Sequence, residues 1–373
     1  MKNLMEILGS TQMLLGINFD PDLLFEERLT SEHRGFLALL RIVEEYLPLL
    51  DTGYSGMGRP RCADVPIFRA YLAKDCFQID KNNLLRQRLL SDSNLRKICG
   101  FRKVPSEATF SRRLVEFSRK NLPASTLAHL VREYHGGRLV RVIARDSTAI
   151  CGREKAQNKK SEVKIKKHKR GRPRKDEVRE PKESKRVTRQ LRQSPGKSLA
   201  ELDKACSWGC KKNSQGNSQY WKGYKLHLDV TEQGIPVSAC VTGANVHDSQ
   251  LAIPLEKMTE RRVTHLYGMA DSAYDFPEHR LYVCGKGRIA VIDPNDRRSS
   301  VMRELGPLER EQFKARTVVE RANSHLKDHL LPAALYVKGH DKVSFVLLMG
   351  VLCLAALKII QPDLMPPGTT SLF

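Results

Sequence analysis

Closely paired cysteines are missing from this sequence, and their absence excludes two classes of small scaffold. The nine cysteines are an odd number, and no two of them form a Cys-x2-Cys pair. Neither a disulfide framework nor a zinc ribbon is therefore expected. Cys206 and Cys210 resemble half of a metal clip, but no second pair follows at a suitable distance. We expect reduced, mostly structural thiols and a cytoplasmic location.

Long hydrophobic runs are also absent. The most apolar stretch, Val343–Leu357, has 15 residues before Lys358, whereas a membrane-spanning helix needs about 20. Near the N-terminus, Glu6 interrupts what would be the apolar part of a signal peptide. We therefore expect Val343–Leu357 to be a buried helix and the protein to have no membrane role.

Acidic residues are too few to balance the basic ones. The chain has 64 Lys and Arg against 42 Asp and Glu, which gives a net charge of +22. A single basic run is usually only a solvated face, but an excess over the whole chain favours a polyanionic partner. With no membrane segment expected, nucleic acid is the favoured partner.

Residues 34–125 have the spacing of an all-α domain, preceded by a leader at 1–33. Gly100 separates the third and fourth predicted helices, and the fourth, capped by Ser106, carries Arg112 and Arg113. This outline is typical of a helix-turn-helix DNA reader, but plain helical bundles also have it, so both interpretations stay open. The predicted helices are Arg34–Leu50, Ala63–Ile79, Asn82–Cys99 and a helix from Ser106 to Lys120.

Residues 136–362 change to an α/β pattern, followed by a tail at 363–373. The turn at 232–234 predicts a hairpin, and later strands alternate with helices, which indicates a sheet with mixed strand directions. The predicted strands are 139–144, 224–231, 236–242, 264–269 and 288–292, and the predicted helices are 249–260, 277–283 and 313–329.

A basic segment at 153–205 interrupts this domain. Residues 153–197 contain 19 Lys and Arg against 6 Asp and Glu, a net charge of +13, with few apolar residues. Such a segment buries too little surface to offset its ordering entropy, so we expect it to be disordered or only partly ordered. Arg170 and Arg172 lie in an Arg-Gly-Arg-Pro core that resembles a minor-groove hook. A generic phosphate-binding arm is the alternative, and both interpretations predict DNA contact.

Three carboxylates stand on successive predicted elements of the α/β domain. Asp146 ends the first strand, Asp271 closes a later strand, and Glu320 lies in the helix 313–329. Singly, each is more often a cap or a surface acid. Together they have the chemistry that Mg²⁺ prefers, hard oxygen ligands from rigid elements, and phosphodiester chemistry commonly uses two such ions.

The helix with Glu320 adds positive charge beside this carboxylate. At 100° per residue, Arg316, Asn323 and Lys327 fall on the same face as Glu320. This face suits a metal ion with adjoining phosphates, although a surface Arg–Glu pair is the simpler alternative. Lys225, on a neighbouring predicted strand, is a further candidate DNA contact. His247 and Asp248 are expected to cap the helix that follows them.

This pattern resembles the Tyr-x2-Arg-x3-Glu-x6-Lys signature of a large group of bacterial insertion-sequence transposases with a DDE triad. Arg316, Glu320 and Lys327 match it in type and spacing, whereas Phe313 stands at the Tyr position and lacks the hydroxyl. Residues 58–111, 223–227, 243–249 and 271–275 also resemble this group, so the resemblance covers about 34–360.

The resemblance implies an RNase H-like catalytic domain at 136–362, with a mixed five-stranded sheet and flanking helices, after the all-α DNA-binding domain. Asp146, Asp271 and Glu320 would be the catalytic residues and would hold two Mg²⁺, with Mn²⁺ able to substitute. Arg316 and Lys327 would bind phosphates of double-stranded DNA, at element ends and at the target. A homodimer in the DNA complex is implied, with a nucleoid-associated location.

Two rival functions stay open at this point. An RNase H-like nuclease would cut DNA without joining it, and a non-catalytic regulator would only bind DNA. The sequence reveals neither the terminal repeat nor the target preference. It also leaves open the excision route and the oligomeric state without DNA.

Overall fold

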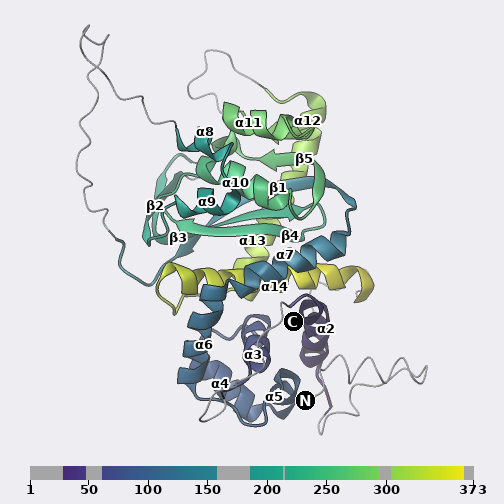
Figure 1. Cartoon of the computed structure of the whole chain (residues 1–373), viewed down its shortest axis with the longest axis vertical. Helices are drawn as coiled ribbons and strands as arrows, with labels where there is room; N and C mark the ends of the chain where they lie inside the picture. Colours follow the sequence, from purple (N-terminus) through teal and green to yellow (C-terminus); the bar gives the residue numbers. More distant parts are fainter. Residues whose placement is uncertain (1–27, 48–60, 158–184, 213–214, 295–303, 365–373) are drawn as a thin grey trace.

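The described residues form a helical end and a sheet-containing end, with two long helices between them (Figure 1). The computed structural model describes residues 28–47, 61–157, 185–212, 215–294 and 304–364. Arg170 and Arg172 lie outside the described residues. The helical end consists of α2 (Ser31–Glu45), α3 (Asp64–Cys76), α4 (Asn82–Ser91), α5 (Ser93–Cys99) and α6 (Glu107–Lys120), and the helices between the ends are α7 (Leu122–His135) and α14 (His340–Leu364).

The expectation of one helix over Asn82–Cys99 was wrong. The chain breaks at Asp92, whose side chain accepts a hydrogen bond of 2.8 Å from the backbone N–H of Leu95. This N-cap satisfies a free donor of a second helix, so a new helix begins where periodicity alone continues the old one. Gly100 ends α5 with φ of 85°, as its position after the helix predicts.

The sheet has mixed strand directions, as expected, but six strands instead of five. β1 pairs antiparallel with β3 and parallel with β5, and β6 continues the parallel side. On its other edge, β3 pairs antiparallel with β2 along its first half and with β4 along its second half. The strands are β1 (Leu139–Cys151), β2 (Ser207–Lys212), β3 (Ser218–Thr231), β4 (Pro236–Gly243), β5 (Thr264–Ala270) and β6 (Ile289–Ile292).

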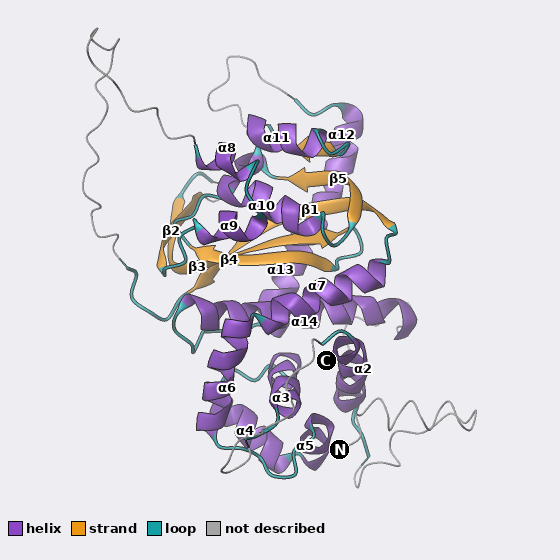
Figure 2. Ribbon diagram, viewed as in Figure 1, coloured by secondary structure: helices purple, strands orange, loops and turns teal. Residues whose placement is uncertain are grey.

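Helices cover both faces of this sheet (Figure 2). α10 lies on one face, where Arg145 of β1 donates to the carbonyl of Ala252 at 2.9 Å. α13 lies on the other, where Asn323 reaches Asp146. Adjacent strand residues point to opposite faces, so β1 serves both layers. The helices of this end are α10 (Ser249–Thr259), α11 (Pro277–Cys284), α12 (Pro307–Phe313) and α13 (Thr317–His325), with short turns η2 (Ser272–Tyr274), η4 (Lys314–Arg316) and η5 (Leu326–Leu330).

The basic segment is ordered in part. Residues 185–205 include α8 (Arg186–Gln190) and α9 (Pro195–Ala200), which pack beside α10. Lys257 of α10 donates to the carbonyls of Gln190, Leu191 and Gln193 at 2.7–3.0 Å. These polar contacts hold a segment whose low apolar content predicted disorder. Residues 158–184 lie outside the described part of the chain.

The buried helix predicted at Val343–Leu357 is confirmed as part of α14. Within the described residues it alone is long and apolar enough to cross a membrane, but 89% of its most apolar window is buried inside the protein. α14 runs between the helical end and the sheet (Figure 1), so its apolar surface is used in joining them. All nine cysteines are free, in agreement with the expected reduced thiols.

Gly223 lies at a close approach between β1 and β3. Its φ is +155°, and a Cβ there would lie 2.1 Å from the carbonyl oxygen of Ile150. We predict that Gly223→Ala lowers the free energy of unfolding by about 3 kcal/mol, because backbone atoms must move apart. Gly268→Ala is the matched control, since nothing lies within 4 Å of a Cβ at that strand glycine. Urea denaturation checks both, and equal effects would contradict the prediction.

Candidate functional site

The strand register brings Asp146 and Asp271 to the same level of the sheet. The last parallel pair between β1 and β5 is Ala144 with Met269, and each aspartate follows its strand's member of that pair by two residues. β5 ends at Ala270, so Asp271 stands at the strand end and caps η2. Asp146, expected at the end of its strand, lies inside β1, because β1 continues beside β3. The carboxylates repel each other electrostatically.

Burial and this repulsion affect the ionisation of both aspartates. Burial raises the pKa of Asp146 to about 6, with a further contribution from the charge of Asp271. Burial also raises the pKa of Asp271, and the charge of Asp248 adds to the effect. Two carboxylates that are costly to ionise side by side are stabilised by a cation between them. Their oxygens are the donors that Mg²⁺ prefers, so this pair fits a divalent ion.

Glu320 approaches the pair from α13 on the other side of Arg316. The Arg316 guanidinium donates to Glu320 at 2.6 Å and lies 3.9 Å from Asp146. The ring of Phe313 lies 5.7 Å from this guanidinium, in the geometry of a cation–π contact. The aromatic ring at this signature position therefore supports Arg316 without needing a hydroxyl. The expected single helix at 313–329 is α12, η4, α13 and η5 in succession.

Arg316 separates the three acids in this structure. Within the described ranges, no group of three or more His, Cys, Asp and Glu side chains lies close enough to hold one metal ion. Half of the Glu320 side chain is exposed to solvent. Arg316 thus pairs with Asp146 and Glu320, and its charge also works to lower the pKa of Asp271.

Asn323 and Lys327 lie farther along the same helical run. Asn323 is buried, and its Nδ2 donates to Asp146 at 3.1 Å, so this side chain orients the carboxylate. Lys327, in η5, is exposed. Partial desolvation and the charge of Lys211 lower the pKa of Lys327, while Asp146 opposes this. Two lysines therefore flank the carboxylates, and Lys211 comes from β2, the strand that the sequence did not predict.

Asp248, expected mainly to cap the following helix, is a further acid of the candidate site, because its charge acts on Asp271. It precedes α10 but makes no side-chain capping bond. Its carboxylate accepts a hydrogen bond of 2.9 Å from Lys225 Nζ. Burial opposes the ionisation of Asp248, but neighbouring positive charge and hydrogen bonds, including those of Lys225, lower its pKa. Its neighbour His247 bonds to the backbone N–H of Ser249 at 3.3 Å, as a cap does.

Two side chains predicted to contact DNA are bound to other groups of the protein. Lys225 is bound to Asp248 and to the carbonyl of Val246 at 3.0 Å. Arg113 is buried and pairs with Asp64 at 3.3 Å, so its charge is used inside the helical end and is not offered to DNA. Arg112, one residue earlier on α6, is exposed.

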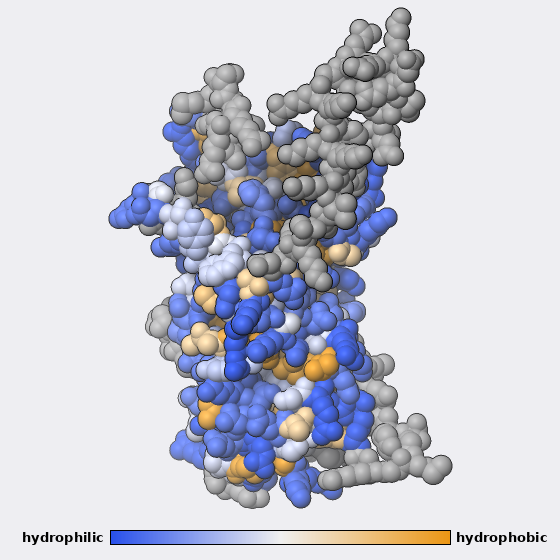
Figure 3. Space-filling view, turned by 90° about the vertical axis from the view of Figure 1, so that its left-hand side faces the viewer, coloured by the Kyte–Doolittle hydropathy of each residue, from blue (hydrophilic) through white to orange (hydrophobic). Residues whose placement is uncertain are grey.

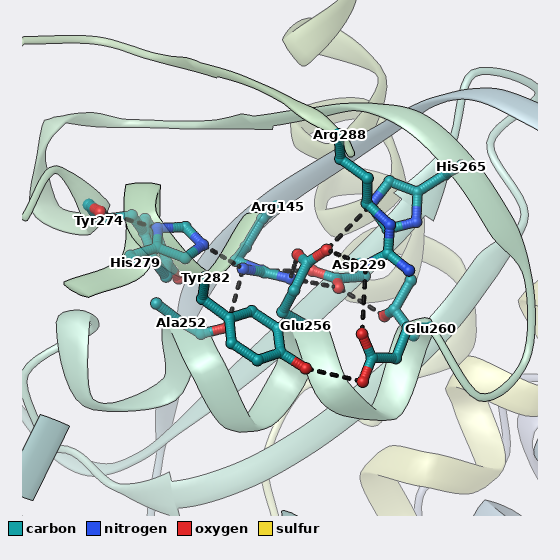
Figure 4. Close-up of polar contacts among 11 residues, drawn as sticks. Arg145, Asp229, Ala252, Glu256, Glu260, His265, Tyr274, His279, Tyr282 and Arg288 are labelled. Atoms are coloured by element: carbon teal, nitrogen blue, oxygen red, sulfur yellow. Dashed lines mark hydrogen bonds and ion pairs between the residues drawn. The ribbon is translucent and has the colours of Figure 1, made fainter. Parts of the chain in front are cut away.

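A buried charge network lies on the opposite face of β1 from Asp146 (Figure 4). The Arg145 guanidinium makes two bonds of 2.7 Å to Asp229 and one of 2.8 Å to Glu256. Burial works against ionisation of Arg145, but the charges of Asp229 and Glu256 raise its pKa. The network therefore links Arg145, the neighbour of Asp146 on β1, to β3 and α10.

This network also reaches the turn that carries Asp271. His279 Nε2 lies 3.2 Å from Arg145, and its Nδ1 lies 3.0 Å from the carbonyl oxygen of Tyr274. Burial lowers the pKa of His279 to about 4, so the ring is neutral at pH 7. A neutral ring donates through Nδ1 to Tyr274 and accepts from Arg145 through Nε2. One chain of hydrogen bonds thus links β1, which contains Asp146, to η2, which Asp271 caps.

Comparison with known families agrees with this arrangement. A family described as "Transposase DDE domain" matches residues 141–356, and a second, "Transposase domain (DUF772)", matches residues 24–115. No curated protein and no solved structure matches the chain. The first match covers more than half of the sequence and contains Asp146, Asp271 and Glu320. The chain therefore belongs to the insertion-sequence transposases with a DDE domain.

Proposed function

We propose that this transposase cleaves DNA at the ends of its insertion sequence and joins the freed 3′-hydroxyl to target DNA, with Mg²⁺ as cofactor. The observation that carries the proposal is the placement of Asp146 and Asp271 at one level of adjacent strands, with Glu320 linked to Asp146 through Arg316. Two aspartates at one level of the sheet, with a third acid joined to one of them by an arginine, suit phosphoryl transfer. The fold, with its mixed six-stranded sheet, is compatible with the RNase H-like class.

Asp146, Asp271 and Glu320 would hold two Mg²⁺, or Mn²⁺ in their place. When bound, the ions supply an activated water and stabilise the leaving oxygen. Glu320 would exchange its bond with Arg316 for a metal contact, because one carboxylate oxygen at 2.6 Å from a guanidinium is already occupied. Arg316 would then be free to bind a phosphate of the transposon end, with Lys327 beside it. Asn323 would keep one oxygen of Asp146 in place.

The helical end would bind the DNA duplex. Arg112 lines a cavity of about 790 Å³ between α4 and α6, together with the basic residues Arg61, Arg86 and Lys103. The surface in Figure 3 is mostly hydrophilic, with apolar residues only in small separate groups. Such a surface suits phosphate contact, whose strength falls as salt rises. Arg170 and Arg172 would add contacts from the basic segment.

Two copies would act together, each holding one end of the element, in the cytoplasm on nucleoid DNA. The first displacement would use water and the second the freed 3′-hydroxyl, at the same carboxylates. Neither step requires a covalent bond to the protein, so no Ser or Tyr nucleophile is assigned.

A cleavage and joining assay tests the proposal. The protein is incubated with Mg²⁺, a labelled element-end duplex and a supercoiled target plasmid, and we expect both a cut product and a joined product. Cut DNA without joining would support a nuclease instead. DNA binding without cutting would support a regulator.

The pKa of Asp146 leads to a pH prediction. In the folded protein Asp146 loses its proton near pH 6, against 3.8 for the ordinary side chain. Metal competes with this proton, so Mn²⁺ affinity should fall about tenfold per unit below pH 6 and level off above it. Without metal, the folded state holds more protons than the unfolded state between these values, so stability should fall as pH rises through this window. Calorimetric titration at pH 5, 6 and 7 checks the affinity, and a flat profile would contradict the prediction.

A further inference from the structure

A cavity of about 660 Å³ lies where the helical end meets α14. Its walls come from α3, α4 and α6 on one side and from α14 and residues 332–338 on the other. It is therefore formed by two parts of the chain that are far apart in sequence. None of the site residues discussed above lines it.

An unpaired carboxylate oxygen lies at the wall of this cavity. Asp75 of α3 is only 5% exposed, and its Oδ2 has no hydrogen-bond partner among the described residues. Leaving a buried polar atom without a partner costs free energy, so such an atom is normally paired in the functional state. A ligand with N–H donors would provide the missing partner.

The opposite wall offers an aromatic surface. Tyr336 is 40% exposed, and Lys81 Nζ lies 4.7 Å from the centre of its ring. Tyr71 of α3 and Phe345 of α14 also line the cavity and meet edge to face, with ring centres 5.3 Å apart. A planar heterocycle can stack on an exposed ring of this kind.

Positive charge predominates among the lining side chains. The basic residues are Lys74, Lys81, Arg153, Lys338 and Lys342, against three acids, Asp75, Asp80 and Glu107. A phosphate near Lys81, Lys338 or Lys342 would meet an excess of positive charge. The cavity therefore combines a donor-seeking carboxylate, a ring and a cationic rim.

We propose that this cavity binds one nucleotide, with the base against Tyr336, an N–H edge of the base on Asp75 and the phosphate at the lysines. Guanine fits best, because its pairing edge presents two adjacent N–H donors to a carboxylate. The inferred source is an unpaired nucleotide of the DNA strand, so this part rests on the proposed function. A smaller cavity of about 240 Å³ shares Lys74, Asp75 and Asp80 with the first and has Lys327 on its wall. It connects the nucleotide site with a lysine beside the carboxylates.

The test measures binding of the full chain in EDTA, where no cleavage occurs. The probes are duplexes with one unpaired guanine, one unpaired adenine or one abasic site at the end, and free dGMP. Wild type should prefer the unpaired guanine over adenine about tenfold. Asp75→Asn should abolish this preference, and Tyr336→Ala should weaken binding of both bases about tenfold while Tyr336→Phe restores it.

Tyr220→Ala is the matched control, since Tyr220 is an exposed tyrosine of β3 that does not line the cavity. Equal affinity for guanine, adenine and abasic ends would overturn the proposal. A loss of affinity in Tyr220→Ala but not in Tyr336→Ala would also overturn it. Because Tyr336 is partly exposed, its variant is informative even if Asp75→Asn fails to fold. Binding of free dGMP that the duplexes do not compete away would support the nucleotide site and overturn the strand as its source. Absence of cleavage with Mg²⁺ would affect the proposed function but not this measurement.

Discussion

Glu320→Gln should lower the rate of Mg²⁺-dependent cleavage by about a thousandfold or more, because a metal ligand supplies several kcal/mol of transition-state stabilisation. The amide has nearly the same shape but no charge, so the fold and the bond from Arg316 to a side-chain oxygen should remain. Affinity for element-end DNA, measured in EDTA, should change little. Asp146→Asn should have an effect of the same size, since it removes the negative charge of a second proposed metal ligand.

Glu311→Gln is the matched control for this experiment. Glu311 lies in α12, before Glu320 in the sequence, and pairs with Lys314 at the surface. Its replacement should leave the cleavage rate within about twofold, because exposed ion pairs contribute little. Equal losses in Glu311→Gln and Glu320→Gln would mean that general charge, not metal binding, explains the defect.

Asp229→Ala should have the largest effect on stability, lowering the free energy of unfolding by about 3–5 kcal/mol, because the buried Arg145 guanidinium loses its two-bond partner. Both side chains are almost fully buried, so water cannot replace the lost carboxylate. The residue next to Arg145 is Asp146, and we therefore also expect weaker Mn²⁺ binding in this variant. Urea denaturation with circular dichroism measures the stability.

Glu304→Ala provides the comparison for this stability prediction. Glu304 pairs with Arg310, and both side chains are mostly exposed. Its loss should cost less than about 1 kcal/mol. If Asp229→Ala also cost less than this, the network would not hold β1, and our explanation of how Asp146 is positioned would fail.

The sequence points to the two candidate aspartates because each follows a short apolar run with the pattern of a strand. The level at which they meet was not, since the parallel register of β1 and β5 depends on packing across the sheet. Glu320 was selected through Arg316 and Asn323, which lie four residues before it and three residues after it. Residues at this spacing share one face of a helix, so their proximity to Glu320 follows from local geometry. The contact of Asn323 with Asp146 joins residues 177 positions apart and required the structure.

Other features had no signal in the sequence. Asp248 has the local context of a helix cap, and only the fold places Lys225 beside it. The partner of Arg145, Asp229, is 84 positions away on another strand. β2 lacks the alternation of a half-buried strand, and its place depends on the ladder with the long strand β3. The ordered residues 185–205 are held by polar contacts to α10, which composition does not reveal.

The most direct test of the central claim is anomalous diffraction from Mn²⁺ in crystals of the protein bound to an element-end duplex. We predict two peaks about 4 Å apart, contacted by oxygens of Asp146, Asp271 and Glu320, with Arg316 moved to a DNA phosphate. Mn²⁺ bound elsewhere, or held by the aspartates while Glu320 stays on Arg316, would contradict the account.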